Sequence, residues 1–184
     1  MPLPIGHSLA GYLTYLGVER DVTFRRWKII LLYLFCANLP DLDILPGFLM
    51  GLPNRYHHGI SHSLGFAILA GMLVILYKRW RGHGHLLRSL SITSGLYFTH
   101  VLLDCLIVDT SFPYGVQLLW PLSSQYVISP VLLFPTVYKA NTSGAFLGSL
   151  FQFGNLKLIG VELLYFLPLV GAAHLILRRR RERS

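Results

Sequence analysis

The sequence predicts an all-α membrane protein, a helical bundle with about four to five membrane-embedded helices and one re-entrant or interfacial segment. Three observations support this prediction. The 184 residues are 53% hydrophobic and only 13% charged, whereas soluble domains are usually about 25% charged. Several apolar runs approach the length of about 20 residues that crosses a bilayer. No linker divides the chain, so residues 1–184 are expected to form a single domain.

Five apolar runs are expected to form the helices. The two short runs, Ile5–Gly17 and Ile29–Leu39, are expected to be half-helices or tilted spans that their neighbours bury. The second of them is expected to end at Pro40, because proline disfavours helix interiors. The three longer runs are Ser63–Tyr77, Ser89–Val108 and Leu156–Leu177.

The segment between the last two runs is expected to lie at the membrane surface. Val131–Val137 is apolar, but Pro130 precedes it and Pro135 interrupts it, which favours the re-entrant or interfacial piece. Trp120 and its aromatic neighbours are expected to form a lip among the lipid headgroups, where Trp and Tyr are enriched.

Basic residues indicate the orientation. Thirteen of the 16 Lys and Arg residues lie in three segments, 20–28, 78–88 and 178–183, which fall on one side if the five runs alternate. The positive-inside rule makes that side, with the C-terminus, cytoplasmic in a multi-pass inner-membrane protein. The net charge of +8 is then expected to meet anionic headgroups. Nucleic-acid binding is not expected, because the charge marks helix ends instead of one continuous face.

Histidines and aspartates gather at the opposite ends of the runs. Each has a structural alternative: His100 and Asp104 can form a helix-internal hydrogen bond, the "PDLD" segment a turn, and "HHGISHS" a wet loop. Together, nitrogen and oxygen donors in an apolar setting favour one or two divalent ions, with Zn²⁺ preferred and Mn²⁺ or Fe²⁺ as alternatives. The candidate metal ligands are His7, Asp41, Asp43, His57, His62, His100 and Asp104, with His58 either a ligand or a catalytic group.

The motifs "PIGHSLAG", "NLPDLDILPG", "NRYHHGISHSL", "HVLLD" and "GVQLLWPLS" occur in this order. With them the chain resembles the YdjM-type family of predicted inner-membrane metal-dependent hydrolases, formerly a domain of unknown function. It is also distantly similar to zinc-dependent phospholipase C. The resemblance covers about residues 3–125 and implies a helical membrane protein whose metal ligands come from the histidines and aspartates of these motifs. His58 and Ser61 depart from the family pattern, where Arg and Thr are frequent.

The expected activity is metal-dependent hydrolysis of a phosphoester in a lipid or lipid-linked substrate at the outer membrane–water boundary. Asp41 or Asp43 is the expected bridging carboxylate. His58 is expected to donate a proton to the leaving group or to bind the phosphate. Arg55 and Trp120 are the expected substrate-binding residues, although Arg55 can also serve as an interfacial anchor.

Two other function classes stay open. Intramembrane His and Asp also mark ion pathways, so the chain can be a divalent-metal transporter or sensor. A structural membrane protein stapled by a closed metal site is the third interpretation. The oligomeric state is not predicted from the sequence.

Overall fold

The computed structural model describes residues 2–110 and 113–183, which form a helical bundle without a regular β-strand. The all-α prediction is therefore confirmed. The elements in chain order are α1 (Pro4–Glu19), α2 (Trp27–Asn38), the 3-10 turn η1 (Leu39–Asp43), α3 (Ile44–Leu49), α4 (Leu64–Trp80), α5 (Leu86–Cys105), α6 (Ser143–Leu150) and α7 (Phe153–Glu182).

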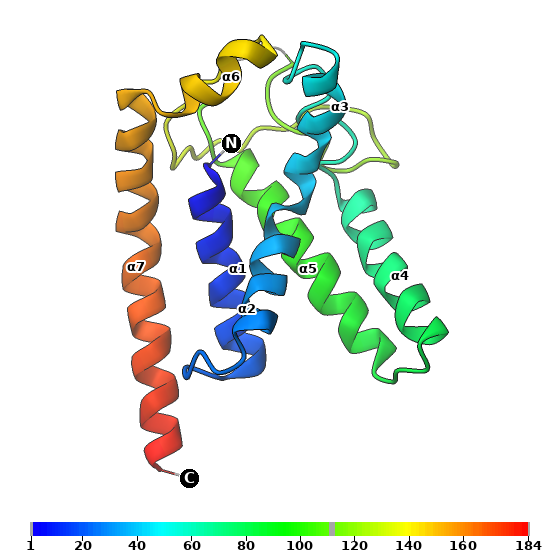
Figure 1. Cartoon of the computed structure of the whole chain (residues 1–184), viewed down its shortest axis with the longest axis vertical. Helices are drawn as coiled ribbons and strands as arrows, with labels where there is room; N and C mark the ends of the chain where they lie inside the picture. The colour runs from blue at the N-terminus through cyan, green and yellow to red at the C-terminus, as the bar shows by residue number, and fades with distance from the viewer. Residues whose placement is uncertain (1, 111–112, 184) are drawn as a thin grey trace.

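Helix α1 lies in the middle of the bundle and contacts α2, α5 and α7, while α4 packs along the other side of α5 (Figure 1). Two glycines permit close approach between neighbouring helices. A Cβ at Gly11 would lie 2.8 Å from the Cβ of Ala37 in α2, and a Cβ at Gly71 would collide with Ser94 of α5. Close backbone approach at small residues is typical of helix packing in membranes.

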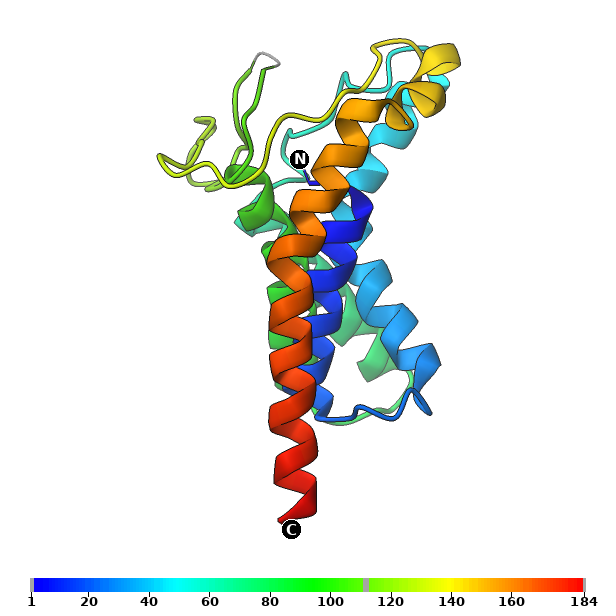
Figure 2. The same cartoon turned by 90° about the vertical axis from the view of Figure 1, so that its left-hand side faces the viewer.

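The two ends of the bundle differ in composition. The α1–α2 loop, the α4–α5 turn and the end of α7, which carry the three basic segments, lie at one end (Figure 1). At the other end are α3, α6, the loop 50–63 and the described parts of the long connection, 106–110 and 113–142, which project to one side of the bundle (Figure 2). The outer faces of α2, α4 and α7 expose large apolar side chains, including Leu32, Leu73 and Leu164. Such faces indicate contact with an apolar environment.

Two described helical stretches are long and apolar enough to cross a membrane, Trp27–Leu49 with 23 residues and Phe153–Glu182 with 30 residues. The first joins α2, η1 and α3. The other described helices fall short in length or hydropathy, so the expected number of four to five membrane-embedded helices is not confirmed.

Three local regions complete the comparison with the sequence. Helix α2 ends at Asn38, before Pro40 as expected, but the chain continues into η1, where Pro40 occupies the first turn and its missing N–H costs little. Val131–Val137 is an irregular segment whose Phe134 is buried and pairs with Ile107 in a single parallel bridge. Its re-entrant or interfacial position stays a prediction. Helix α6 lies in a stretch where the sequence predicted no element.

Candidate metal centre

The loop before α4 brings its histidines to the top of the bundle. Ser63 caps α4 by accepting a hydrogen bond from the N–H of Phe66 at 3.1 Å, a typical N-cap contact. The hydroxyl of Tyr97 in α5 donates to the carbonyl of Ser61 at 2.8 Å. These two contacts fix the loop, and they place His62 as a fully buried side chain between α4 and α5.

Helix α5 supplies an imidazole and a carboxylate from one face. His100 and Asp104 are one turn apart, and the His100 Nε2 lies 3.1 Å from the Asp104 Oδ2. The Nε2 of His62 lies 3.2 Å from the same oxygen. All three side chains are buried. The α5 motif is therefore joined to the histidine loop around one carboxylate.

Helices α1 and η1 complete the cluster. The His7 ring stacks on the His100 ring with centroids 3.6 Å apart, and the His7 Nε2 lies 3.5 Å from the Asp104 Oδ1. The Asp41 Oδ1 lies 3.3 Å from the His100 Nε2 and 3.7 Å from the His62 Nε2. Four separate segments thus deliver three imidazoles and two carboxylates to one buried point.

The buried polar atoms of this cluster fit a bound cation. Side-chain nitrogens and oxygens buried without a hydrogen-bond partner are costly and call for an explanation. Here such atoms converge from several residues. Within each of three groups of side chains, the possible ligand atoms lie within 4.8 Å of one another: His57, His58 and His62; His7, Asp41 and His100; and His62, His100 and Asp104. Mixed nitrogen and oxygen donors suit Zn²⁺, Mn²⁺ or Fe²⁺. The atoms without a hydrogen bond, most of which face one another at 3.1–3.7 Å, are the His7 Nδ1 and Nε2, Asp41 Oδ1, His58 Nε2, His62 Nε2, His100 Nε2 and both Asp104 oxygens.

Hydrogen bonds at the other ring nitrogens aim the imidazoles at the cluster. The His100 Nδ1 lies 2.8 Å from the carbonyl oxygen of Ala37, to which it can donate. The His62 Nδ1 lies 3.1 Å from Asp43, and the His57 Nδ1 lies 2.9 Å from the same carboxylate. Metal-binding histidines usually make such contacts, which leave Nε2 free as the ligand. Asp43 therefore has the position of an orienting carboxylate, whereas Asp41 and Asp104 face the free Nε2 atoms.

The charge states of the loop histidines follow from their burial and neighbours. Burial, together with the charge of Lys139, lowers the pKa of His57 to about 4. Burial and the adjacent His57 hold the pKa of His58 well below its usual value. Burial also opposes protonation of His62, but its contacts with three aspartates outweigh this effect and raise its pKa. The aspartates of the centre therefore stabilise a positive charge placed next to them, whereas the imidazoles of His57 and His58, which line the cavity, are neutral.

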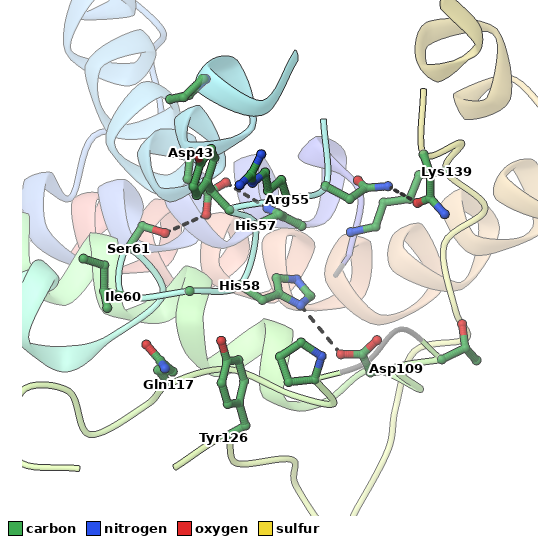
Figure 3. Close-up of a pocket in the computed structure, with 17 residues that line it drawn as sticks. Asp43, Arg55, His57, His58, Ile60, Ser61, Asp109, Gln117, Tyr126 and Lys139 are labelled. Carbon is green, nitrogen blue, oxygen red and sulfur yellow. Dashed lines mark hydrogen bonds and ion pairs between the residues drawn. The ribbon is translucent and has the colours of Figure 1, made fainter. Parts of the chain in front are cut away.

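A polar cavity of about 920 Å³ opens beside the cluster. Figure 3 shows His58 inside it, with its Nδ1 3.7 Å from the Asp109 Oδ2. Arg55 and Lys139 also line it, and Lys139 extends toward the histidines in Figure 3. Lys139 has no ion-pair partner among the described residues. Burial lowers the pKa of Lys139, an effect that the carboxylates of Asp104, Asp41, Asp109 and Asp43 oppose.

Comparison with known proteins identifies the family. The model of the family described as "YdjM inner membrane protein" matches residues 1–180. The chain belongs to the YdjM family. It is also 33% identical to the inner membrane protein YbcI of Escherichia coli (strain K12) over 134 residues, which cover 71% of this chain and 73% of YbcI. No solved structure matches. The resemblance noted from the motifs is thereby confirmed at the level of the family, and the chain is an inner membrane protein.

In this YdjM family member, the predicted site residues separate into three groups. His7, Asp41, His62, His100 and Asp104 lie within the buried cluster, and Asp43, His57, His58 and Arg55 lie where it meets the cavity. Trp120 is not among the residues lining the cavity. Its ring packs on Phe66 of α4 with centroids 5.6 Å apart, and its carbonyl accepts the N–H of Gly65. These contacts fix the position of Trp120 beside α4, and its substrate contact stays a prediction.

Several polar residues of the site region were not predicted from the sequence. Glu162 of α7 is buried and accepts the backbone N–H groups of Leu3 and Gly6, which holds the start of α1 next to His7. An isolated acidic residue within an apolar run was the available signal. Asn155 is also buried and fixes the connection near Lys139 by pairing with both backbone groups of Tyr138. No local pattern marks such long-range contacts.

Proposed function

We propose that the chain is a membrane-bound metal-dependent hydrolase that cleaves a phosphoester of a lipid or lipid-linked substrate. The supporting observation is the convergence of unpartnered, buried imidazole nitrogens and carboxylate oxygens beside a polar cavity that carries two cationic side chains. A catalytic centre needs both features: ligands that hold a cation and open space where a substrate can meet it.

The residues divide the work. His7, Asp41, His62, His100 and Asp104 hold one or two divalent ions, with Zn²⁺ favoured by the donor set. Asp43 orients the rings of His57 and His62. When bound, such an ion lowers the pKa of a coordinated water to about 7 and polarises a phosphoryl oxygen.

The cavity residues bind the substrate and move protons. Lys139 and Arg55 provide positive charge for phosphoryl oxygens that carry negative charge. The Nε2 of His58 has no partner, and its Nδ1 faces Asp109. Because the ring is neutral and its Nδ1–H faces the Asp109 carboxylate, the His58 Nε2 is suited to accept a proton from the attacking water and then to return that proton to the leaving oxygen.

The placement in the membrane belongs to the same proposal. Helices α1 and α5 are embedded against the two longer stretches, and α4 is embedded beside α5, in spite of their shorter apolar length. The basic end faces the cytoplasm, by the positive-inside rule. The metal centre then lies at the outer membrane–water boundary, within reach of lipid headgroups.

A metal-transport function is disfavoured by the core on the basic side of the centre. One turn or more from His7, Ala37 and His100, the helices are sealed by Tyr15, Leu16, Ile30, Tyr33 and Leu96, all buried. A permeation path needs polar groups throughout the membrane depth. In the described residues of this core cluster, only tyrosine hydroxyls interrupt the apolar packing.

The test combines metal analysis with a substrate screen. Purified protein loaded with Zn²⁺ or Mn²⁺ is expected to cleave at least one member of a panel of phospholipids and prenyl phosphates. His100→Ala is expected to abolish cleavage, whereas His85→Ala, at the other end of the bundle, is expected to retain it. Absence of cleavage by metal-loaded protein, together with Asp104-dependent metal flux into liposomes, would replace the hydrolase by a transporter.

A further inference from the structure

A second cavity, an apolar groove, lies beside the metal centre. Its volume of about 330 Å³ falls within the range of ligand pockets, about 300–1,000 Å³. One wall comes from η1, and the other from the first three turns of α4. The lining residues are Leu39, Pro40, Leu42, Asp43, Ser61, Phe66, Leu69, Ala70, Leu73 and Tyr97.

The groove adjoins the polar cavity along a shared edge. Asp43 and Ser61 line both of them, and the Ser61 hydroxyl donates a hydrogen bond to the Asp43 Oδ2 at 2.6 Å. Apart from these two residues and Tyr97, the walls of the groove are entirely apolar. A molecule that occupied both spaces would therefore meet charge at one end and hydrocarbon at the other.

The groove also opens to the side of the bundle. Leu42, Leu69 and Leu73 expose 45%, 39% and 58% of their surface. The adjacent α4 residues Met72 and Leu76 are exposed as well, so the mouth lies in a continuous apolar surface. Large exposed apolar surfaces of this kind mark contact with lipid in a membrane protein. A chain can thus enter sideways from the bilayer.

We propose that this groove binds one hydrocarbon chain of an amphiphile whose phosphate head lies in the polar cavity. The identity of the head rests on the proposed function, while the chain site rests on the groove itself. Charge complementarity supports this occupant, because Arg55 and Lys139 offer cationic groups for the head. The shared edge at Asp43 and Ser61 keeps the head next to the cluster while the chain remains in an apolar environment.

Photolabelling in nanodiscs tests the chain site without any need for hydrolysis. The probe is phosphatidic acid with a diazirine at the middle of one acyl chain, diluted into phosphatidylcholine. Labelling is expected to saturate, to be displaced by unlabelled phosphatidic acid, and to map to residues 39–42 and 66–73. Unsaturable labelling spread over the exposed faces of α2, α4 and α7 would overturn the proposal, as would labelling that maps to contacts between two copies of the chain.

Two variants that fill the groove sharpen the test. Ala70→Trp and Leu73→Trp are each expected to reduce the saturable labelling at least fivefold. Met72→Trp adds the same ring to the exposed side of α4 outside the groove and is expected to label like the parent. Equal labelling in all four proteins contradicts the proposal. If Ala70→Trp fails to fold, Leu73→Trp and the parent's labelling map decide the question.

The outcome is separable from that of the proposed function. Saturable groove labelling in a protein that cleaves no phosphoester would support the chain site and reject the hydrolase. Cleavage of lipid phosphoesters without saturable labelling in the groove would overturn this inference alone.

Discussion

Asp43→Asn separates an orienting carboxylate from a metal ligand. In the structure, one Asp43 oxygen faces the His57 Nδ1 at 2.9 Å and the other faces the His62 Nδ1 at 3.1 Å. Asparagine keeps the size of the side chain but replaces one acceptor oxygen by an NH₂ donor. That donor would oppose the N–H of one imidazole, so at least one ring must turn or change its tautomer.

The magnitude follows from the number of rings affected. Loss of one orienting partner typically lowers metal affinity about 10–100-fold. Because Asp43 orients two imidazoles, the upper value is expected, about 100-fold or about 3 kcal/mol. Asp104→Asn removes charge at the oxygens that face the Nε2 atoms of His62 and His100. It is expected to cost far more, because it removes a ligand instead of its support.

The assay is a competitive Zn²⁺ titration against a chromogenic chelator, with purified proteins in detergent. Ser61→Ala is the matched control. Its hydroxyl contacts both Asp43 and the His62 Nδ1 but carries no charge, so its loss is expected to change affinity less than tenfold, about one neutral hydrogen bond. Equal losses in Asp43→Asn and Asp104→Asn would refute the orienting role and would make Asp43 a direct ligand.

Three further predictions concern the cavity, the α1 anchor and the topology. Lys139→Gln is expected to raise the KM for an anionic phosphoester at least tenfold, with a smaller change in kcat. The control Lys157→Gln is expected to leave both constants unchanged. An unaltered KM in Lys139→Gln would exclude Lys139 from substrate binding. Glu162→Gln is expected to lower stability by about 2 kcal/mol, the worth of a hydrogen bond to a charged group, which a lowered Tm would register. A single cysteine in place of Ser124 is expected to react with a thiol reagent added from outside the cell, and a single cysteine in place of His83 is expected to be protected. The reverse result would invert the topology.

Much of the bundle can be predicted because long apolar runs in a sequence usually form membrane-embedded or buried helices. The runs that form α1, α2, α4, α5 and α7 were found from hydrophobicity and length. The continuation of the chain into η1 and α3 was not, because a proline in the first turn of η1 is compatible with a continuing helical path. Helix α6 is only eight residues long, which is too short for a periodic pattern to identify it.

The site shows the same division between local and long-range information. His100 and Asp104 stand out because ionisable residues are rare in apolar helices. Lys139 reaches the cavity only because Asn155 of α7 holds the backbone of Tyr138. Glu162 meets the start of α1 across 156 residues of sequence separation from Gly6. Contacts of this kind depend on tertiary packing and have no signature in a single sequence.

The most direct test of the central claim is the metal content of the purified protein, measured by inductively coupled plasma mass spectrometry. The parent chain is expected to hold about one or two divalent ions, as catalytic His/Asp centres do. The His100→Ala, Asp104→Ala double variant is expected to hold none above background, while His83→Ala keeps the parent's content. Full metal content in the double variant, or no retained metal in the parent after loading, would contradict the metal centre.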